Sequence, residues 1–78
     1  MFEKIVEIYR DITGDYTTQI TPKTKIGSDL QLSSLGVAQL VCEIEDVFDI
    51  EFTGKDIRSF KTVQDLADCI EKKIDEKK

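Results

Sequence analysis

The chain has 78 residues, of which 11 are Lys or Arg and 16 are Asp or Glu, so its formal net charge is −5 at pH 7. It contains no histidine, no tryptophan, two cysteines and one proline. Without histidine, a Ser-His-Asp triad, a Cys-His pair and an imidazole-ligated zinc site are excluded, and two cysteines are too few for a four-cysteine metal site. The negative charge also argues against non-specific binding of nucleic acid or anionic membranes.

The length is sufficient for one folded domain, which we expect to occupy residues 1–78. Apolar residues make up 40% of the chain, which is enough for a small core, and no apolar run is long enough to span a membrane. The first residues do not resemble a signal peptide, because Glu3, Lys4 and Glu7 interrupt the apolar positions. We therefore expect a monomeric, cytoplasmic protein with reduced thiols.

The first periodic segment predicts a helix over residues 2–13, with one apolar face formed by Phe2, Ile5, Val6, Tyr9 and Ile12. Gly14 follows and can adopt the left-handed conformation that ends a helix. Residues 14–33 lack helical periodicity and are rich in Thr, Ser, Gly and Pro, so they predict a loop of about 20 residues, longer than most structural connections. Four apolar side chains are expected to anchor this loop to the core: Ile20, Ile26, Leu30 and Leu32.

The strongest helical pattern predicts a second helix over residues 34–48. Its expected apolar stripe is wide and consists of Leu35, Ala38, Leu40, Val41, Ile44, Val47 and Phe48. Ser33 and Ser34 stand at its start and are residue types that cap helices. Cys42 lies in this helix and Cys69 in the last one; such thiols are usually buried small apolar side chains, and without CxxC spacing they do not indicate a redox pair.

Two capping signals organise the rest of the chain. Thr53 with Asp56, and Thr62 with Asp65, have the spacing of a capping box. They predict a short third helix over residues 55–60 and a fourth helix whose apolar face contains Val63, Leu66, Ala67, Ile70 and Ile74. Since no strand pattern is present, the predicted fold class is all-α. We expect a small four-helix bundle with three main helices, one short helix and a long loop between the first two.

The negative charge belongs to the middle of the chain. Residues 26–54 contain six acids and no Lys or Arg, so this segment carries −6 and the remainder carries +1. The six acids are Asp29, Glu43, Glu45, Asp46, Asp49 and Glu51. A solvated helix face and a docking surface for a basic partner both explain this pattern, and charge alone does not decide between them.

The sequence contains no recognisable catalytic machinery. Carboxylates such as Glu45 and Glu51 have no partner base or predicted apolar pocket, and no segment has the ligand spacing of an EF-hand. Ser34 stands out because it lies where the long loop meets a helix N-terminus, whose free N–H groups would hold a phosphate attached to its hydroxyl. From the local sequence alone, capping by Ser33 or Ser34 is the favoured role.

The order of these features resembles the acyl carrier protein family over essentially the whole chain. Residues 20–35 resemble the family's loop and attachment motif, in which an Asp-Leu pair, here Asp29-Leu30, precedes an Asp-Ser-Leu triplet, here Ser33-Ser34-Leu35. Residues 40–52 resemble the family's acidic second helix with its Phe-Asp-Ile exit, and residues 59–66 resemble the stretch before the last helix.

The resemblance implies a carrier and not an enzyme. Ser34 would receive 4′-phosphopantetheine from coenzyme A through a phosphopantetheinyl transferase, and the thiol of this arm would hold acyl groups as thioesters. The other partners would be acyl-transfer or synthase enzymes of fatty-acid, lipid or polyketide-type biosynthesis. Their basic patches would meet a partner face formed by Leu35, Gln39, Glu45, Asp46 and Glu51.

The chain departs from the family pattern at the start of the second helix. Ser33 replaces the Asp that helps the transferase recognise the carrier, and Gly36 and Gln39 stand where acids are common. Cys42 takes an interior position that a larger apolar residue usually fills, which would reshape an acyl cavity. These departures suggest a specialised carrier. Two alternatives stay open: a carrier of aminoacyl or peptidyl units, and an unmodified acidic interaction module with a carrier-like fold.

Overall fold

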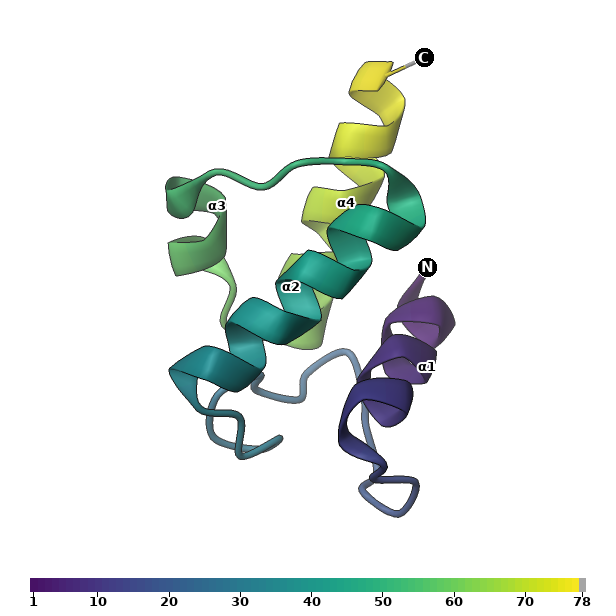
Figure 1. Cartoon of the computed structure of the whole chain (residues 1–78), viewed down its shortest axis with the longest axis vertical. Helices are drawn as coiled ribbons and strands as arrows, with labels where there is room; N and C mark the ends of the chain where they lie inside the picture. Colours follow the sequence, from purple (N-terminus) through teal and green to yellow (C-terminus); the bar gives the residue numbers. More distant parts are fainter. Residues whose placement is uncertain (78) are drawn as a thin grey trace.

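The computed structural model describes residues 1–77, which form four helices (Figure 1). Helix α1 spans Phe2–Thr13, α2 spans Ser34–Phe48, α3 spans Gly54–Ser59 and α4 spans Val63–Lys77. Residues 1–77 contain no strand, only an isolated bridge between Lys25 and Thr62. The predicted all-α fold is confirmed, and so are the bounds of the first two helices. Helix α3 starts and ends one residue earlier than predicted.

The core lies where α1, α2 and α4 face one another. Ile44 of α2 and Ile70 of α4 are 0% exposed, and Leu66 of α4 is 1% exposed. Helix α1 contributes Ile5, Ile8 and Tyr9, of which the predicted face had omitted Ile8. Full burial of one aliphatic side chain of this size stabilises a fold by about 1.5–3 kcal/mol, so each of these residues is important to the stability of a chain this short.

The predicted stop and start signals act as expected at the helix ends. Gly14 ends α1 in the left-handed conformation, with φ 73°. At α3, the Asp56 carboxylate accepts the Thr53 N–H at 2.9 Å, and the Thr53 hydroxyl accepts the Asp56 N–H at 3.1 Å. Thr62 and Asp65 form the same reciprocal pair at α4, with distances of 3.1 and 3.2 Å. Local hydrogen bonds therefore define where these helices begin and end.

The long loop between α1 and α2 is held to the body of the protein by buried side chains and backbone bonds. Ile26 and Leu30 are 4% and 6% exposed, and Ile20 and Leu32 pack partly buried against the core, as predicted. The Val63 N–H donates to the carbonyl of Thr24 at 2.9 Å, which joins the loop to the first turn of α4. The loop is thus an ordered part of the fold, and it delivers the chain to the start of α2.

Asp15 organises the first turn of this loop. Its carboxylate accepts the N–H groups of Thr17 and Thr18 at 3.0 and 3.1 Å and the hydroxyls of both residues. The Tyr9 hydroxyl of α1 also donates to it, at 3.1 Å. The hydrogen bond from the Thr18 hydroxyl and those from the two backbone N–H groups hold the pKa of Asp15 well below its ordinary value.

The apolar stripe of α2 is narrower than predicted. Leu40, Val41 and Ile44 are buried, whereas Leu35 is 78% exposed and Ala38 and Val47 are exposed as well. The expectation that Cys42 is an interior residue is wrong, because its side chain is exposed. Position 42 lies two residues from the core residue Ile44 and therefore about 200° around the helix. Cys69 is partly buried, which is closer to the buried position predicted for both thiols.

Candidate functional site

The two serines at the start of α2 have different roles. Ser33 is the N-cap, in extended conformation, and its hydroxyl oxygen accepts the N–H of Gly36 at 3.3 Å. Ser34 is the first residue of the helix, its side chain is exposed, and its hydroxyl has no hydrogen-bond partner among residues 1–77. The local sequence left open which serine caps the helix. The structure assigns the cap to Ser33, so the Ser34 hydroxyl is available for another role.

An apolar groove of about 400 Å³ lies beside Ser34. The loop, α2 and α3 all contribute to it, and its lining residues are Gly27, Leu32, Ser33, Ser34, Val37, Ala38 and Ile57. The first N–H groups of a helix have no partner within the helix and favour a negative group nearby. An exposed hydroxyl at this end, next to an open groove, is therefore suited to a prosthetic arm attached through a phosphate.

Gly36 contributes to the shape of this groove. A Cβ atom at position 36 would lie 3.1 Å from Cδ2 of Leu32, closer than an ordinary contact. Glycine therefore lets Leu32 lie directly against the first turn of α2, where it forms part of the groove wall. By its intrinsic helix propensity alone, glycine costs a helix about 1 kcal/mol relative to alanine. The structure adds the contact for which glycine leaves room.

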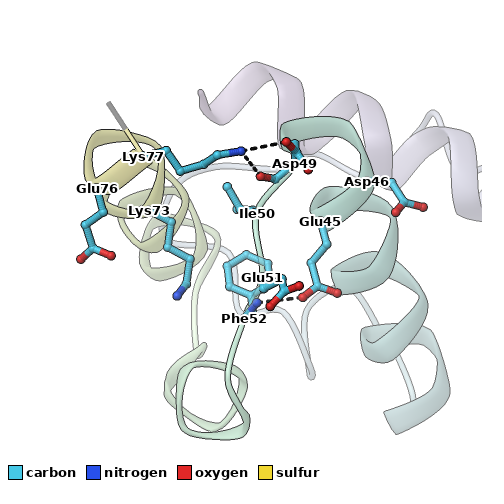
Figure 2. A pocket seen from close by; sticks show the side chains of 9 residues that line it. All are labelled: Glu45, Asp46, Asp49, Ile50, Glu51, Phe52, Lys73, Glu76 and Lys77. Atoms are coloured by element: carbon cyan, nitrogen blue, oxygen red, sulfur yellow. Dashed lines mark hydrogen bonds and ion pairs between the residues drawn. The ribbon is translucent and has the colours of Figure 1, made fainter.

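A second hollow, of about 690 Å³, lies at the opposite end of α2, between that helix, the connector to α3 and the end of α4 (Figure 2). It is mainly charged, with the carboxylates of Glu45, Asp46, Asp49, Glu51 and Glu76 and the amines of Lys73 and Lys77. Lys77 donates to the Asp49 carboxylate at 2.9 Å and also to the Asp49 carbonyl oxygen. Glu45 and Glu51, considered above as a carboxylate pair, thus line a polar hollow and not an apolar pocket.

Glu45 and Asp46 differ in this hollow although they are neighbours in the sequence. The Glu45 side chain is partly buried, and its Oε2 accepts the N–H of Phe52 at 2.8 Å (Figure 2). This bond ties the connector after α2 to the last turns of the helix. Asp46 is exposed. The family resemblance implied that both carboxylates lie on the partner face, and the structure gives Glu45 an additional role within the fold.

Three of the predicted partner-face residues form one stripe along the exposed side of α2. Leu35, Gln39 and Asp46 are all exposed and share this stripe with Cys42. Their separations of four, three and four residues place them one above another on a helix. Cys42 was not predicted to belong to this stripe, because the sequence pattern placed its thiol in the interior. Cys42 lies about 200° around the helix from Ile44, and this spacing could have placed its side chain on the exposed side.

Helix α3 is attached to α4 by an ion pair that the sequence did not indicate. Lys73 Nζ lies 2.9 Å from Asp56 Oδ2 and 5.9 Å from the centroid of the Phe52 ring. The Phe52 ring packs edge-on against Phe60 at 5.2 Å. The hydrogen bond from the Thr53 N–H and the bond from Lys73 lower the pKa of Asp56 to about 2, and the bond to Asp56 raises the pKa of Lys73.

Residues 1–77 offer neither a metal site nor a membrane-spanning helix. No group of carboxylates and thiols in this part of the chain could hold a metal ion. No helix there has the length and apolar content needed to cross a bilayer.

A small helical bundle that presents an exposed serine hydroxyl at a helix start, beside an apolar groove, has the features expected of a protein that carries an attached group. The family model described as the phosphopantetheine attachment site matches residues 3–70. The chain therefore belongs to the acyl carrier protein family, whose members bear 4′-phosphopantetheine and act as carriers rather than enzymes.

Individual relatives agree with this assignment. The chain is 38% identical over 69 residues to an acyl carrier protein of Syntrophobacter fumaroxidans, covering 88% of this chain and 85% of that protein. It is 31% identical over 74 residues to an acyl carrier protein of Coprothermobacter proteolyticus, covering 95% and 90%. The crystal structure of an acyl carrier protein from Thermotoga maritima superposes with a TM-score of 0.86 at 28% identity, covering 97% of this chain and 88% of the other.

Proposed function

We propose that Ser34 bears the phosphopantetheine arm and that the protein delivers acyl intermediates to enzymes of fatty-acid, lipid or polyketide-type biosynthesis. The observation that supports this proposal best is the division of labour between the two serines. Ser33 caps α2, so the Ser34 hydroxyl is exposed and takes no part in holding the helix together. Covalent attachment at Ser34 would therefore leave the fold intact.

The residues around Ser34 would hold the phosphate end of the arm and guide the remainder. The first N–H groups of α2 would face the phosphate. Leu32, Val37 and Ile57 would offer apolar contact to an arm or acyl chain that lies along the groove. When bound, the group supplies a thiol that holds acyl groups as thioesters. The chain contains no histidine, and bond making and breaking would belong to the partner enzymes.

Intact-mass analysis after incubation with coenzyme A, Mg²⁺ and a phosphopantetheinyl transferase tests the proposal. We expect a gain of one phosphopantetheinyl group in the wild type and none in Ser34→Ala. Ser33→Ala is the matched control: it removes the helix cap, at a cost of about 1 kcal/mol, but keeps the attachment hydroxyl. A gain that persists in Ser34→Ala, or no gain with several transferases including the one from the same genome, contradicts the proposal.

We further propose that partner enzymes dock on the exposed stripe of α2 and the adjacent acids, with Leu35, Gln39 and Asp46 as central contacts and Glu45 and Glu51 at the end. Basic patches on these enzymes complement this side. Asp46→Lys should weaken partner binding, and the weakening should shrink at high salt. Glu71→Lys makes the same charge change at an exposed position of α4 and should leave binding unchanged. Equal affinities for the two variants would exclude Asp46 from the docking face.

A second candidate function is an unmodified acidic interaction module, favoured by the serine at position 33 where the family has an Asp. In that case Ser34→Ala should keep partner binding and cellular function, whereas a working carrier should lose its function altogether. If the chain is loaded, the mass of the thioester-bound group distinguishes acyl from aminoacyl or peptidyl cargo. We place the protein in the cytoplasm as a monomer, in keeping with an exposed unpaired thiol at Cys42.

A further inference from the structure

The charge of the surface changes sign where α3 begins. The segment without Lys or Arg ends at Gly54, and the next residues include the exposed cations Lys55, Arg58 and Lys61. Within residues 1–77, no carboxylate lies at ion-pair distance from any of these three side chains. Their charges are therefore available to a partner molecule.

The one acid of α3 does not cancel this positive charge. Asp56 is partly buried, and its carboxylate accepts the Thr53 N–H at 2.9 Å and pairs with Lys73 of α4 at 2.9 Å. It is thus neutralised on the inner side of the helix by a cation from another element. What α3 presents to solvent is the ammonium of Lys55 and the guanidinium of Arg58.

Helix α3 borders the groove next to the proposed attachment residue. Ile57 of α3 is 37% exposed and lines this groove together with Ser34 and Ala38 of α2. Figure 1 shows α3 beside α2, on the side away from α1. A protein that reaches Ser34 over the groove therefore meets α2 on one side and α3 on the other. Helix α2 carries no charged residue from Ser34 to Cys42, and its charged residues, from Glu43 on, are all acids.

We propose that α3 is a cationic second contact of the docking surface, and that the enzymes acting on the arm place carboxylates against Lys55 and Arg58. This inference rests on the proposed attachment at Ser34. The partner surface it calls for is bipolar, with acidic side chains opposite α3 and basic side chains opposite the C-terminal half of α2. A cationic contact beside the groove and an acidic contact toward the other end of α2 fix the orientation of the partner, which a single acidic patch does not.

The experiment uses the transferase from the genome that encodes this chain, because it is the first enzyme that must dock at Ser34. The rate of modification is followed by intact mass for the wild type, for Lys55→Glu/Arg58→Glu and for Lys55→Gln/Arg58→Gln. We expect kcat/KM to fall about tenfold on charge reversal, by a smaller factor on neutralisation, and by less in both variants at high salt. Lys4→Glu/Lys72→Glu is the matched control, since it makes the same net charge change outside the groove lining, and it should stay within about twofold of the wild type.

Whether the charge reversal at Lys55 and Arg58 slows or accelerates modification decides whether the inference holds. If the surface opposite α3 is basic, replacing the two cations by acids makes modification faster, and this result overturns the inference. An unchanged rate overturns it as well, while the proposed role of Ser34 stands because the wild type gains mass. No mass gain in the wild type contradicts the attachment itself. Equal urea midpoints for the variants and the wild type confirm that the fold is the same in each comparison.

Discussion

The hydrogen bond between Glu45 and the connector after α2 leads to a quantitative prediction. Glu45→Ala removes the carboxylate that accepts the Phe52 N–H at 2.8 Å, whereas Asp46→Ala removes a neighbouring carboxylate that is exposed. Both changes delete one negative charge from the same helix. They differ in whether a hydrogen bond within the chain is lost, so each variant serves as the control for the other.

The size of the effect follows from the kind of bond that is lost. A hydrogen bond to a charged group contributes about 1.5–3 kcal/mol to the free energy of unfolding, and the partial burial of Glu45 indicates the lower end, about 1.5 kcal/mol. For a chain this short the urea m-value is about 1 kcal/mol per molar, so the midpoint of Glu45→Ala should fall by about 1.5 M. Asp46→Ala should change the free energy of unfolding by less than about 0.5 kcal/mol.

Urea unfolding followed by far-UV circular dichroism measures both midpoints. Glu45→Gln keeps a neutral acceptor and should lie between the wild type and Glu45→Ala. Amide exchange at Phe52 should accelerate in Glu45→Ala, because that N–H loses its partner. If Glu45→Ala and Asp46→Ala unfold at the same urea concentration, the bond to Phe52 does not stabilise the exit from α2 and the reasoning is refuted.

Three further predictions concern other contacts. Asp56 has a pKa of about 2 against an ordinary 3.8, so its ionised form stabilises the fold. This contribution is complete above about pH 4 and is lost as pH falls toward 2. Between pH 4 and pH 2 the urea midpoint should therefore fall less in Asp56→Asn than in the wild type. Asp15→Ala should lower the thermal midpoint and accelerate amide exchange at Thr18, and unchanged exchange would contradict its role in the loop. Gly36→Ala should leave the free energy of unfolding nearly unchanged when Leu32 is present. In a Leu32→Ala background, where the new methyl group has room, the same change should raise it by about 1 kcal/mol. Equal effects in both backgrounds would contradict the proposed contact between position 36 and Leu32.

The ends of the helices could be predicted from the sequence because they depend on neighbouring residues. Gly14 stops α1 through its own backbone conformation, and the capping boxes at Thr53 and Thr62 involve residues three positions apart. The burial of Ile26 and Leu30 was also predictable, since an otherwise polar loop offers few other anchors. The family resemblance pointed to Ser34 by its place before Leu35, although the local sequence favoured a capping role.

The side of α2 that faces solvent could not be predicted with the same accuracy. The apolar residues Leu35 and Ala38 suggested a wide stripe, but only the packing of α1 and α4 decides which part of the helix circumference is covered. Cys42 was placed on the wrong side for this reason. The comparison with the family pattern had suggested that Cys42 reshapes an interior cavity. Because its side chain is exposed, it does not.

The sequence by itself determined the four helices, their order and the confinement of negative charge to residues 26–54, because propensities, caps and composition act over a few residues. Only the tertiary structure decided which carboxylates remain available to partners. Glu45 is bound by Phe52 seven residues away, and Asp56 is paired with Lys73 seventeen residues away. Such contacts depend on how the helices pack, so the charges that α2 and α3 leave exposed are decided only when the chain is folded.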